Sequence, residues 1–160
     1  MALHLIRPLE PADLPQVIEA YHDAVLSQAP ALYSQRQVEA WAGHAASSDQ
    51  LRPALLRGHG LACCSTATPG TIEAFALLDP IDRLSLLYCR GRSSRRGLAA
   101  RLVRALEDHA GQQGVTLLRT EASQLSRPLL QRLGWWVEAE EEVMFAGEPF
   151  RRWRMLRRLG

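Results

Sequence analysis

The stretch Leu84–Ala105 reads LSLLYCRGRSSRRGLAARLVRA and is the most informative part of the chain. It begins with a mostly apolar strand and ends with an amphipathic helix, and a loop rich in glycine and arginine joins the two. The N–H groups of such a loop and of the helix N-terminus converge on one point, where the positive end of the helix dipole also lies. The segment therefore predicts a site for a phosphate-bearing ligand, surrounded by Arg92, Arg95 and Arg96.

The loop is neither of the two common nucleotide-binding motifs. A P-loop needs G-x-x-x-x-G-K-[ST], and this chain has no lysine; G-x-G-x-x-G is also absent. The segment instead resembles the acyl-CoA signature of the GNAT N-acetyltransferase superfamily, which is a strand, a four-residue spacer and [Q/R]-x-x-G-x-[G/A]. Cys89 ends the strand, Arg90–Ser93 is the spacer and Ser94–Ala99 is the loop. Ser94 departs from the usual Gln or Arg, which removes one polar side chain but keeps the backbone cradle.

A second motif follows at the separation expected of this family. The segment Thr116–Ser123 reads as a strand and Gln124–Trp136 as a loop and short helix. They resemble the pattern [N/S]-x-x-A-x-P-[FL]-[YF]-x-x-x-G-[FW], with Ser123 at the Asn/Ser position and Ser126 at the Ala position. Gly134 suits the residue that ends the helix. The resemblance covers roughly residues 4–157 and is strongest over 84–136.

The resemblance implies an α/β (α+β) fold in which helices flank a mixed, mostly antiparallel central sheet, in the order βααβββαβαββ. It implies one GNAT-like domain over residues 1–160. Periodicity and turn residues predict strands at His4–Leu9, Gly60–Thr66, Ile72–Leu78, Leu84–Cys89, Val115–Glu121, Val137–Phe145 and Phe150–Leu156. The same signals predict helices at Pro11–Gln28, Ser34–Gly43, Leu98–Ala110 and Pro128–Leu133, with a short helical piece at Leu51–Arg57.

Composition agrees with a globular enzyme and excludes several other classes. The 160 residues are 47% hydrophobic and 22% charged, which disfavours disorder. A net charge of +2 argues against bulk binding of nucleic acid. The arginines are clustered, six between Arg90 and Arg104 and five between Arg151 and Arg158. We expect the first cluster to bind phosphate and the second to protect a solvated strand edge.

The cysteines and the N-terminus indicate a reduced, cytoplasmic setting. Three cysteines, of which Cys63 and Cys64 are adjacent, form no disulfide framework, and no spacing suggests a metal site. The first residues are too polar for a signal peptide, and no apolar run is long enough to span a membrane. We expect no membrane partner; a homodimer is left open.

The chemistry implied by the resemblance is direct transfer of an acetyl group from acetyl-CoA to a primary amine of a small molecule or peptide. The backbone of Leu87, Tyr88 and Cys89 would hold the acetyl carbonyl and the pantetheine, and a backbone N–H would stabilise the developing oxyanion. The remaining residues expected to bind acetyl-CoA are Ser94, Arg95, Arg96, Gly97, Leu98, Ala99, Ser123 and Ser126. No metal takes part.

The acid and the base of this reaction are not evident. Many relatives carry a tyrosine where this chain has Leu130, and some carry an acidic base where it has Arg83. Glu121, at the end of a predicted strand, is the leading candidate for the general base, and Glu73 is a weaker one. The alternative for Glu121 is an ion pair with a nearby arginine.

The acceptor pocket is assigned with similar alternatives. Tyr33, beside the bend at Pro30, is the substrate-binding candidate, whereas Tyr21 and Trp41 are expected to pack in the core. Two rival functions stay open. One is a GNAT-fold module that binds acyl-CoA without catalysis, and the other is an arginine-rich nucleic-acid binder, which the low net charge disfavours.

Overall fold

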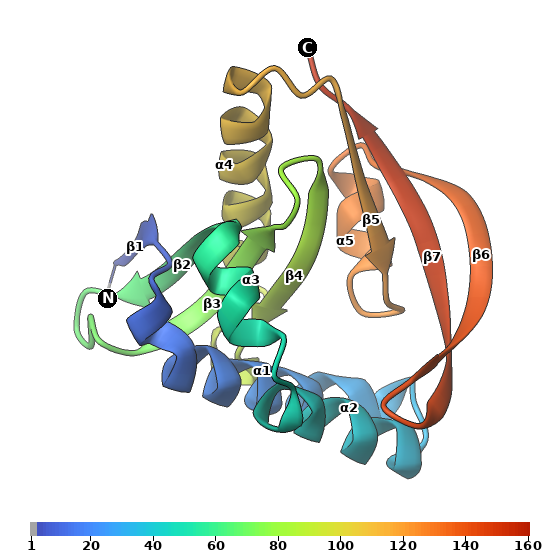
Figure 1. The fold of residues 1–160 in the computed structure, drawn as a ribbon. Helices are drawn as coiled ribbons and strands as arrows, with labels where there is room; N and C mark the ends of the chain where they lie inside the picture. The colour runs from blue at the N-terminus through green and yellow to red at the C-terminus, as the bar shows by residue number, and fades with distance from the viewer. Residues whose placement is uncertain (1–2) are drawn as a thin grey trace.

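One twisted sheet runs through the molecule, and the computed structural model describes it within residues 3–160. Its seven strands lie in the order β1-β2-β3-β4-β5-β7-β6 (Figure 1). All neighbouring strands are antiparallel except β4 and β5. The strands are β1 (His4–Pro8), β2 (His59–Ser65), β3 (Ile72–Leu78), β4 (Arg83–Cys89), β5 (Leu117–Ala122), β6 (Trp136–Phe145) and β7 (Glu148–Arg158).

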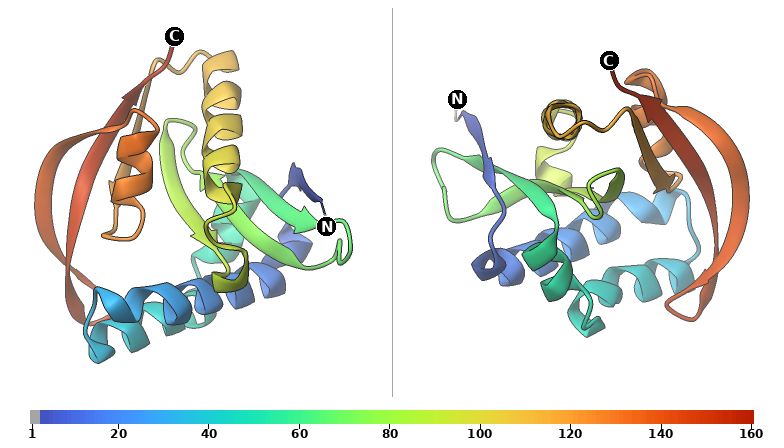
Figure 2. Two further views of the ribbon diagram at one scale, coloured as in Figure 1. Left: turned by 180° about the vertical axis from the view of Figure 1, so that it is seen from behind. Right: turned by 45° about the horizontal axis from the view of Figure 1, so that its top comes forward.

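Helices cover both faces of this sheet (Figure 2). Helices α1 to α3 pack on one face and α4 and α5 on the other, and each group has its own apolar core. Because side chains alternate along a strand, β3 contributes Phe75 and Leu77 to the first core and Ala76 and Leu78 to the second. The helices are α1 (Leu14–Gln28), α2 (Gln35–Ser47), α3 (Leu51–Arg57), α4 (Leu98–Gln112) and α5 (Arg127–Arg132), with 3-10 turns η1 (Pro11–Asp13), η2 (Ala29–Ala31) and η3 (Gly91–Ser93).

The parallel neighbours β4 and β5 are paired over only two residues each. Arg83 lies opposite Arg119 and Leu84 opposite Thr120. The hydroxyl of Thr120 donates to the carbonyl of Leu84 at 2.6 Å and closes this junction. Beyond it the strands separate, as Figure 1 shows, and the sheet opens into a V between its two halves. This opening positions the candidate site.

The expected fold class and element order are confirmed, with Leu51–Arg57 formed as the helix α3. Two details differ. The predicted helix Pro11–Gln28 begins as the 3-10 turn η1 before α1. The helix α2 does not end at Gly43 but continues to Ser47, because Ala42 and Ala45 extend its buried face and a single glycine costs only about 1 kcal/mol.

The second arginine cluster is not at a strand edge, which corrects the sequence-based expectation. The strand β7 lies between β5 and β6, and β6 is the outer strand. The arginines of β7 face glutamates of β6 across the hairpin, and they form ion pairs between Arg151 and Glu140, Arg152 and Glu141, and Arg154 and Glu138 at 3.0, 2.6 and 3.5 Å. Sequence clusters of opposite charge thus become one cross-strand ladder.

Candidate active site

The loop Ser94–Ala99 leaves β4 and presents its backbone at the start of α4. Arg95 and Gly97 both adopt positive φ, at 62° and 78°, and Gly97 is the N-cap residue of α4. A Cβ placed on Gly97 would meet nothing within 4 Å, so the space above the loop is open. Within residues 3–160, the N–H groups of residues 95–100 have no hydrogen-bond acceptor in the protein. Such open N–H groups at a helix N-terminus suit an anionic oxygen.

The side chains of this loop contribute unequally. Arg95 and Arg96 are exposed, and no acid in the described part of the chain pairs with either. The hydroxyl of Ser94 donates to the carbonyl of Gly91 at 2.8 Å, so it braces the loop. Leu98 points into the core beneath α4 and is 3% exposed, which leaves only its backbone for a ligand.

Glu73 on β3 anchors the spacer before the loop. Its carboxylate, on a residue that is 3% exposed, accepts from Arg92 Nε and Nη2 at 2.9 and 2.6 Å and from the Ser93 hydroxyl at 2.6 Å. These hydrogen bonds lower the pKa of Glu73 to about 2. Arg92 therefore pairs with Glu73. This corrects the expectation from the sequence that Arg92 would surround the phosphate site together with Arg95 and Arg96. Through these hydrogen bonds Glu73 anchors the spacer, and it does not line the cavity described below.

The helix α1 holds the same spacer from the other side. Asp23 accepts the N–H of Gly91 at 2.9 Å, and Gln28 Nε2 donates to the carbonyl of Cys89 at 2.6 Å. A Cβ on Gly91 would lie 2.6 Å from Ser27, so only glycine fits this approach. Arg90 is 5% exposed and donates from Nε to the carbonyl of Ile72 at 2.7 Å. The end of β4 is consequently rigidly held.

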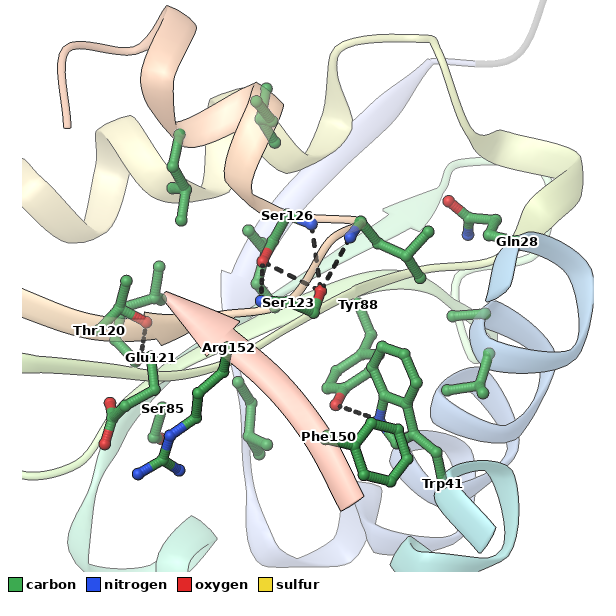
Figure 3. A pocket seen from close by; sticks show the side chains of 18 of the residues that line it. Gln28, Trp41, Ser85, Tyr88, Thr120, Glu121, Ser123, Ser126, Phe150 and Arg152 are labelled. Carbon is green, nitrogen blue, oxygen red and sulfur yellow. Dashed lines mark hydrogen bonds between the residues drawn. The ribbon is translucent and has the colours of Figure 1, made fainter. Parts of the chain in front are cut away.

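A cavity of about 290 Å³ occupies the V between β4 and β5 (Figure 3). It brings together most of the residues predicted for the site. Those that line it are Tyr33, Leu87, Tyr88, Cys89, Ala99, Glu121, Ser123 and Ser126. The loop residues Ser94, Arg95, Arg96, Gly97 and Leu98 do not line it; they precede Ala99 and lie beside it in the chain.

An aromatic cluster forms the wall of the cavity on the side of α1 and α2. Trp41 Nε1 donates to the hydroxyl of Tyr88 at 3.1 Å, and the ring of Phe150 lies 6.0 Å from that of Trp41. Tyr33 packs edge-on against Trp41 at 5.3 Å, and its hydroxyl accepts the N–H of Gln124 at 2.9 Å. Trp41 is 7% exposed and packs in the first core, as the sequence predicted, and it also lines the cavity; Phe150 was not singled out from the sequence. Neither has a local signal for this wall, because strand β7 reaches it only through the tertiary fold.

Burial decides the protonation of three groups in the cavity. It raises the pKa values of the phenols of Tyr33 and Tyr88, so both are neutral and neither acts as a base at neutral pH. It also raises the pKa of the Cys89 thiol to about 11. A thiol must be deprotonated to attack a carbonyl, so Cys89 is not a nucleophile here.

Glu121 lines the closed end of the cavity and pairs with Arg83. Arg83 Nε donates to both carboxylate oxygens, at 3.2 and 3.1 Å, so the predicted alternative of an ion pair is present. Each oxygen keeps a lone pair that can take a proton. The role of Glu121 as a base stays a prediction. Leu130 also lines the cavity, is 1% exposed and is apolar.

Two serine hydroxyls lie together at the start of α5, and Figure 3 shows them at the centre of the cavity wall. Ser123 Oγ accepts the N–H groups of Leu125 and Ser126 at 3.1 and 3.2 Å. Ser126 Oγ accepts the N–H of Ser123 at 3.0 Å and lies 3.3 Å from Ser123 Oγ. The two predicted serines are thus brought together in one hydrogen-bonded turn.

The described part of the chain has neither a membrane-spanning helix nor a cluster of metal-binding side chains. Within residues 3–160, no helix is both long and apolar enough to cross a membrane. Nor do three His, Cys, Asp or Glu side chains of these residues gather as a metal would require.

Comparisons with known proteins agree with this geometry. The sequence profile of the acetyltransferase (GNAT) domain matches residues 30–157. A GCN5-related N-acetyltransferase from Rhodopseudomonas palustris is 26% identical, with a TM-score of 0.90 over 99% of this chain and 98% of its own. PaiA N-acetyltransferase from Thermoplasma acidophilum, solved with coenzyme A, is 17% identical, with a TM-score of 0.79 over 98% and 99%.

A third structure is YncA from Salmonella typhimurium, solved with acetyl-CoA. It is 18% identical, with a TM-score of 0.64 over 99% of this chain and 95% of its own. No curated protein sequence matches the chain. The two relatives below 25% identity show a shared fold.

Proposed function

Since this chain belongs to the GNAT acetyltransferase family, we propose that it moves the acetyl group of acetyl-CoA directly to a primary amine in a ternary complex. The observation that carries the proposal is the cavity in the V between β4 and β5. One end adjoins a loop with open N–H groups, and the other end is an aromatic wall. Two substrates that enter from these two ends meet between the strands, which supplies much of the rate acceleration.

The loop and the two strands fit acetyl-CoA as a substrate. The N–H groups of residues 95–100 suit its pyrophosphate, and Arg95 and Arg96 add positive charge beside them. The edge of β4 at Leu87–Cys89 is free of β5 and borders the cavity, so its backbone can bond the pantetheine. The proteins PaiA and YncA, whose structures contain coenzyme A and acetyl-CoA, support this assignment.

The aromatic wall is the proposed acceptor side. Tyr33, Trp41 and Phe150 would hold the apolar part of a small molecule or of a peptide. We propose that the amine nitrogen attacks the acetyl carbonyl and that Glu121 takes its proton, directly or through water. The bond between the carbonyl carbon and sulfur then breaks, and its electron pair goes to sulfur.

Two experiments test this function. Native mass spectrometry of the purified protein shows whether CoA is bound, and a panel of amines with acetyl-CoA then identifies turnover. We expect bound CoA and transfer to at least one primary amine. If the protein binds no CoA, the proposal is wrong.

The base is tested with Glu121→Gln, which keeps size and hydrogen bonding and removes basicity. Turnover should fall by roughly 10²–10⁴-fold, with the affinity for acetyl-CoA little changed. The pH–rate profile should lose its acidic limb. Wild-type turnover and an unchanged profile would make Glu121 a structural partner of Arg83 only.

A second candidate function is a module that binds acyl-CoA without catalysis. Leu130 and Arg83 favour it, because neither side chain can serve as the acid or base that relatives carry at these positions. Acetyl-CoA binding without turnover of any amine in the panel would favour this candidate.

A further inference from the structure

The hydrogen bonds of Ser123 and Ser126 fix the direction in which their hydroxyl protons point. Ser123 Oγ accepts two N–H groups, from Leu125 at 3.1 Å and from Ser126 at 3.2 Å. A hydroxyl has two lone pairs, so its acceptor capacity is full. In the contact of 3.3 Å between the two hydroxyls, Ser123 is therefore the donor and Ser126 the acceptor.

The same count leaves one proton without a partner. Ser126 Oγ accepts the hydroxyl of Ser123 and also its N–H, at 3.0 Å, so both lone pairs of Ser126 are used. Its own proton is therefore available for donation outward, and Ser126 Oγ makes no further hydrogen bond within the described residues 3–160. Successive hydrogen bonds in a chain polarise one another, which makes this terminal hydroxyl a stronger donor.

The cavity is where this proton can find an acceptor. Ser126 lines it together with Leu129 and Leu130 of α5, and of these three only Ser126 carries a donor side chain. The cavity is also lined by Leu87–Cys89, the backbone proposed to hold the acyl end of acetyl-CoA. The leaving sulfur, which gains negative charge as its bond to carbon breaks, is the acceptor that the proposed reaction would bring there.

We propose that Ser126 donates a hydrogen bond to the sulfur of CoA as the thiolate leaves, an inference that rests on the proposed acetyl transfer. The nitrogen–carbon bond forms, the carbon–sulfur bond breaks and sulfur keeps the electron pair. Ser126 keeps its proton, because a serine hydroxyl is a weaker acid than a thiol. The amine proton goes to the base or to water, and the thiolate is protonated later by water.

The first test measures the thiol of bound CoA and does not need turnover. The absorbance of the thiolate against pH gives the pKa of bound CoA in the wild type and in two variants. Ser126→Thr keeps the hydroxyl. Ser126→Val has the shape of threonine but carries a methyl group in place of the hydroxyl. We expect the pKa in the Ser126→Val complex to be higher by about 1, a tenfold effect, and the Ser126→Thr complex to match the wild type. Equal values in the wild type and in Ser126→Val would overturn the inference.

The second test uses kcat with an amine that the wild type acetylates. Ser126→Ala should lower kcat about 10- to 100-fold, as for a lost hydrogen bond to a charged group, with an unchanged dissociation constant for acetyl-CoA. Leu130→Tyr in the Ser126→Ala background should restore part of kcat. Helical side chains point toward the N-terminus, so this tyrosine would direct its hydroxyl over the turn that contains Ser126.

The two failures are distinguishable. A wild-type protein that turns over no amine defeats the proposed function, and the thiol measurement still decides the role of Ser126. An active wild type with the same kcat as Ser126→Ala defeats only the inference about Ser126. A melting temperature for each variant separates a loss of folding from either outcome.

Discussion

The two arginine-rich segments, residues 90–104 and 151–158, resemble each other in the sequence and have different surroundings in the structure. The second segment lies on β7 opposite four glutamates of β6, and three of its arginines pair across the strands. In the first segment, Arg90 and Arg92 also pair with acids, but Arg95 and Arg96 reach none within the described residues. Their charge lies beside open N–H groups. The partners within reach, and not the number of arginines, distinguish the proposed binding loop from the charged ladder.

The substitution Gly97→Glu should break this comparison most strongly. It places a side chain in the open space above the loop, strains a backbone with φ of 78° and adds negative charge where phosphate is expected. We expect the affinity for acetyl-CoA to fall about 100-fold or more in calorimetry, from about 1–2 kcal/mol of strain plus repulsion. Gly111→Glu is the matched control, because Gly111 is exposed near the other end of α4 with nothing within 4 Å of its Cβ. Unchanged affinity in Gly97→Glu would remove the loop from the site.

Glu73→Gln tests the buried anchor that holds Arg92 away from the loop. Because the pKa of Glu73 is lowered from 4.5 to about 2, its ionised form stabilises the folded state above pH 4.5, and this contribution is lost as pH falls toward 2. We expect a loss of about 2 kcal/mol at pH 7, reduced by screening because the Arg92 side chain is 64% exposed. Urea unfolding of both proteins from pH 7 to 2.5 measures it. A difference that stays constant over this range would contradict the assignment.

Removing the two arginines of the loop Ser94–Ala99, neither of which pairs with an acid in the described part of the chain, sharpens the comparison. The double variant Arg95→Ala/Arg96→Ala should bind acetyl-CoA about tenfold more weakly, and its affinity should depend less on salt concentration. Arg119→Ala/Arg154→Ala is the control, with the same change of charge at two arginines that pair with acids and do not line the cavity. Equal losses in the two double variants would mean that net charge alone governs binding.

The ladder itself should contribute the least. Arg154 and Glu138 are 50% and 47% exposed and lie 3.5 Å apart. Exposed pairs contribute about 0–1 kcal/mol, so Arg154→Ala should change the free energy of unfolding by less than about 1 kcal/mol. Urea unfolding at low and high salt checks this expectation; a large loss would show that the ladder is a cooperative network.

Features encoded by neighbouring residues were predicted well from the sequence. Gly97 and Gly134 both have positive φ, as a loop before a helix and a residue after one require. Ser34 caps α2 by accepting the N–H of Gln37 at 3.2 Å. The strand–loop–helix at Leu84–Ala105 follows from the same local signals. These features need no knowledge of what packs against them.

Features that depend on distant neighbours were not predictable in this way. The sequence places Arg92 beside the loop and therefore assigned it to the phosphate site. Its actual partner, Glu73, lies nineteen residues earlier and reaches Arg92 only because the fold packs β3 against the spacer. Trp41 becomes part of the cavity because β7 brings Phe150 beside it. The interior place of β7 also depends on strand order, and charge patterning along one strand carries no information about which strand is outermost.

The hydrogen bonds between α1 and the end of β4 couple two parts of the molecule. Ala24 and Val25 of this helix line the cavity, while Asp23 and Gln28, on adjoining turns, hold Gly91 and Cys89. The helix α1 therefore connects the cavity wall to the spacer that leads into the proposed phosphate-binding loop. If binding at the proposed acceptor site displaces α1, the affinity for acetyl-CoA must change, and acetyl-CoA must change the affinity for the acceptor by the same factor. The affinity for each substrate would then depend on whether the other is bound, through α1 as well as through their direct contact at the reacting atoms.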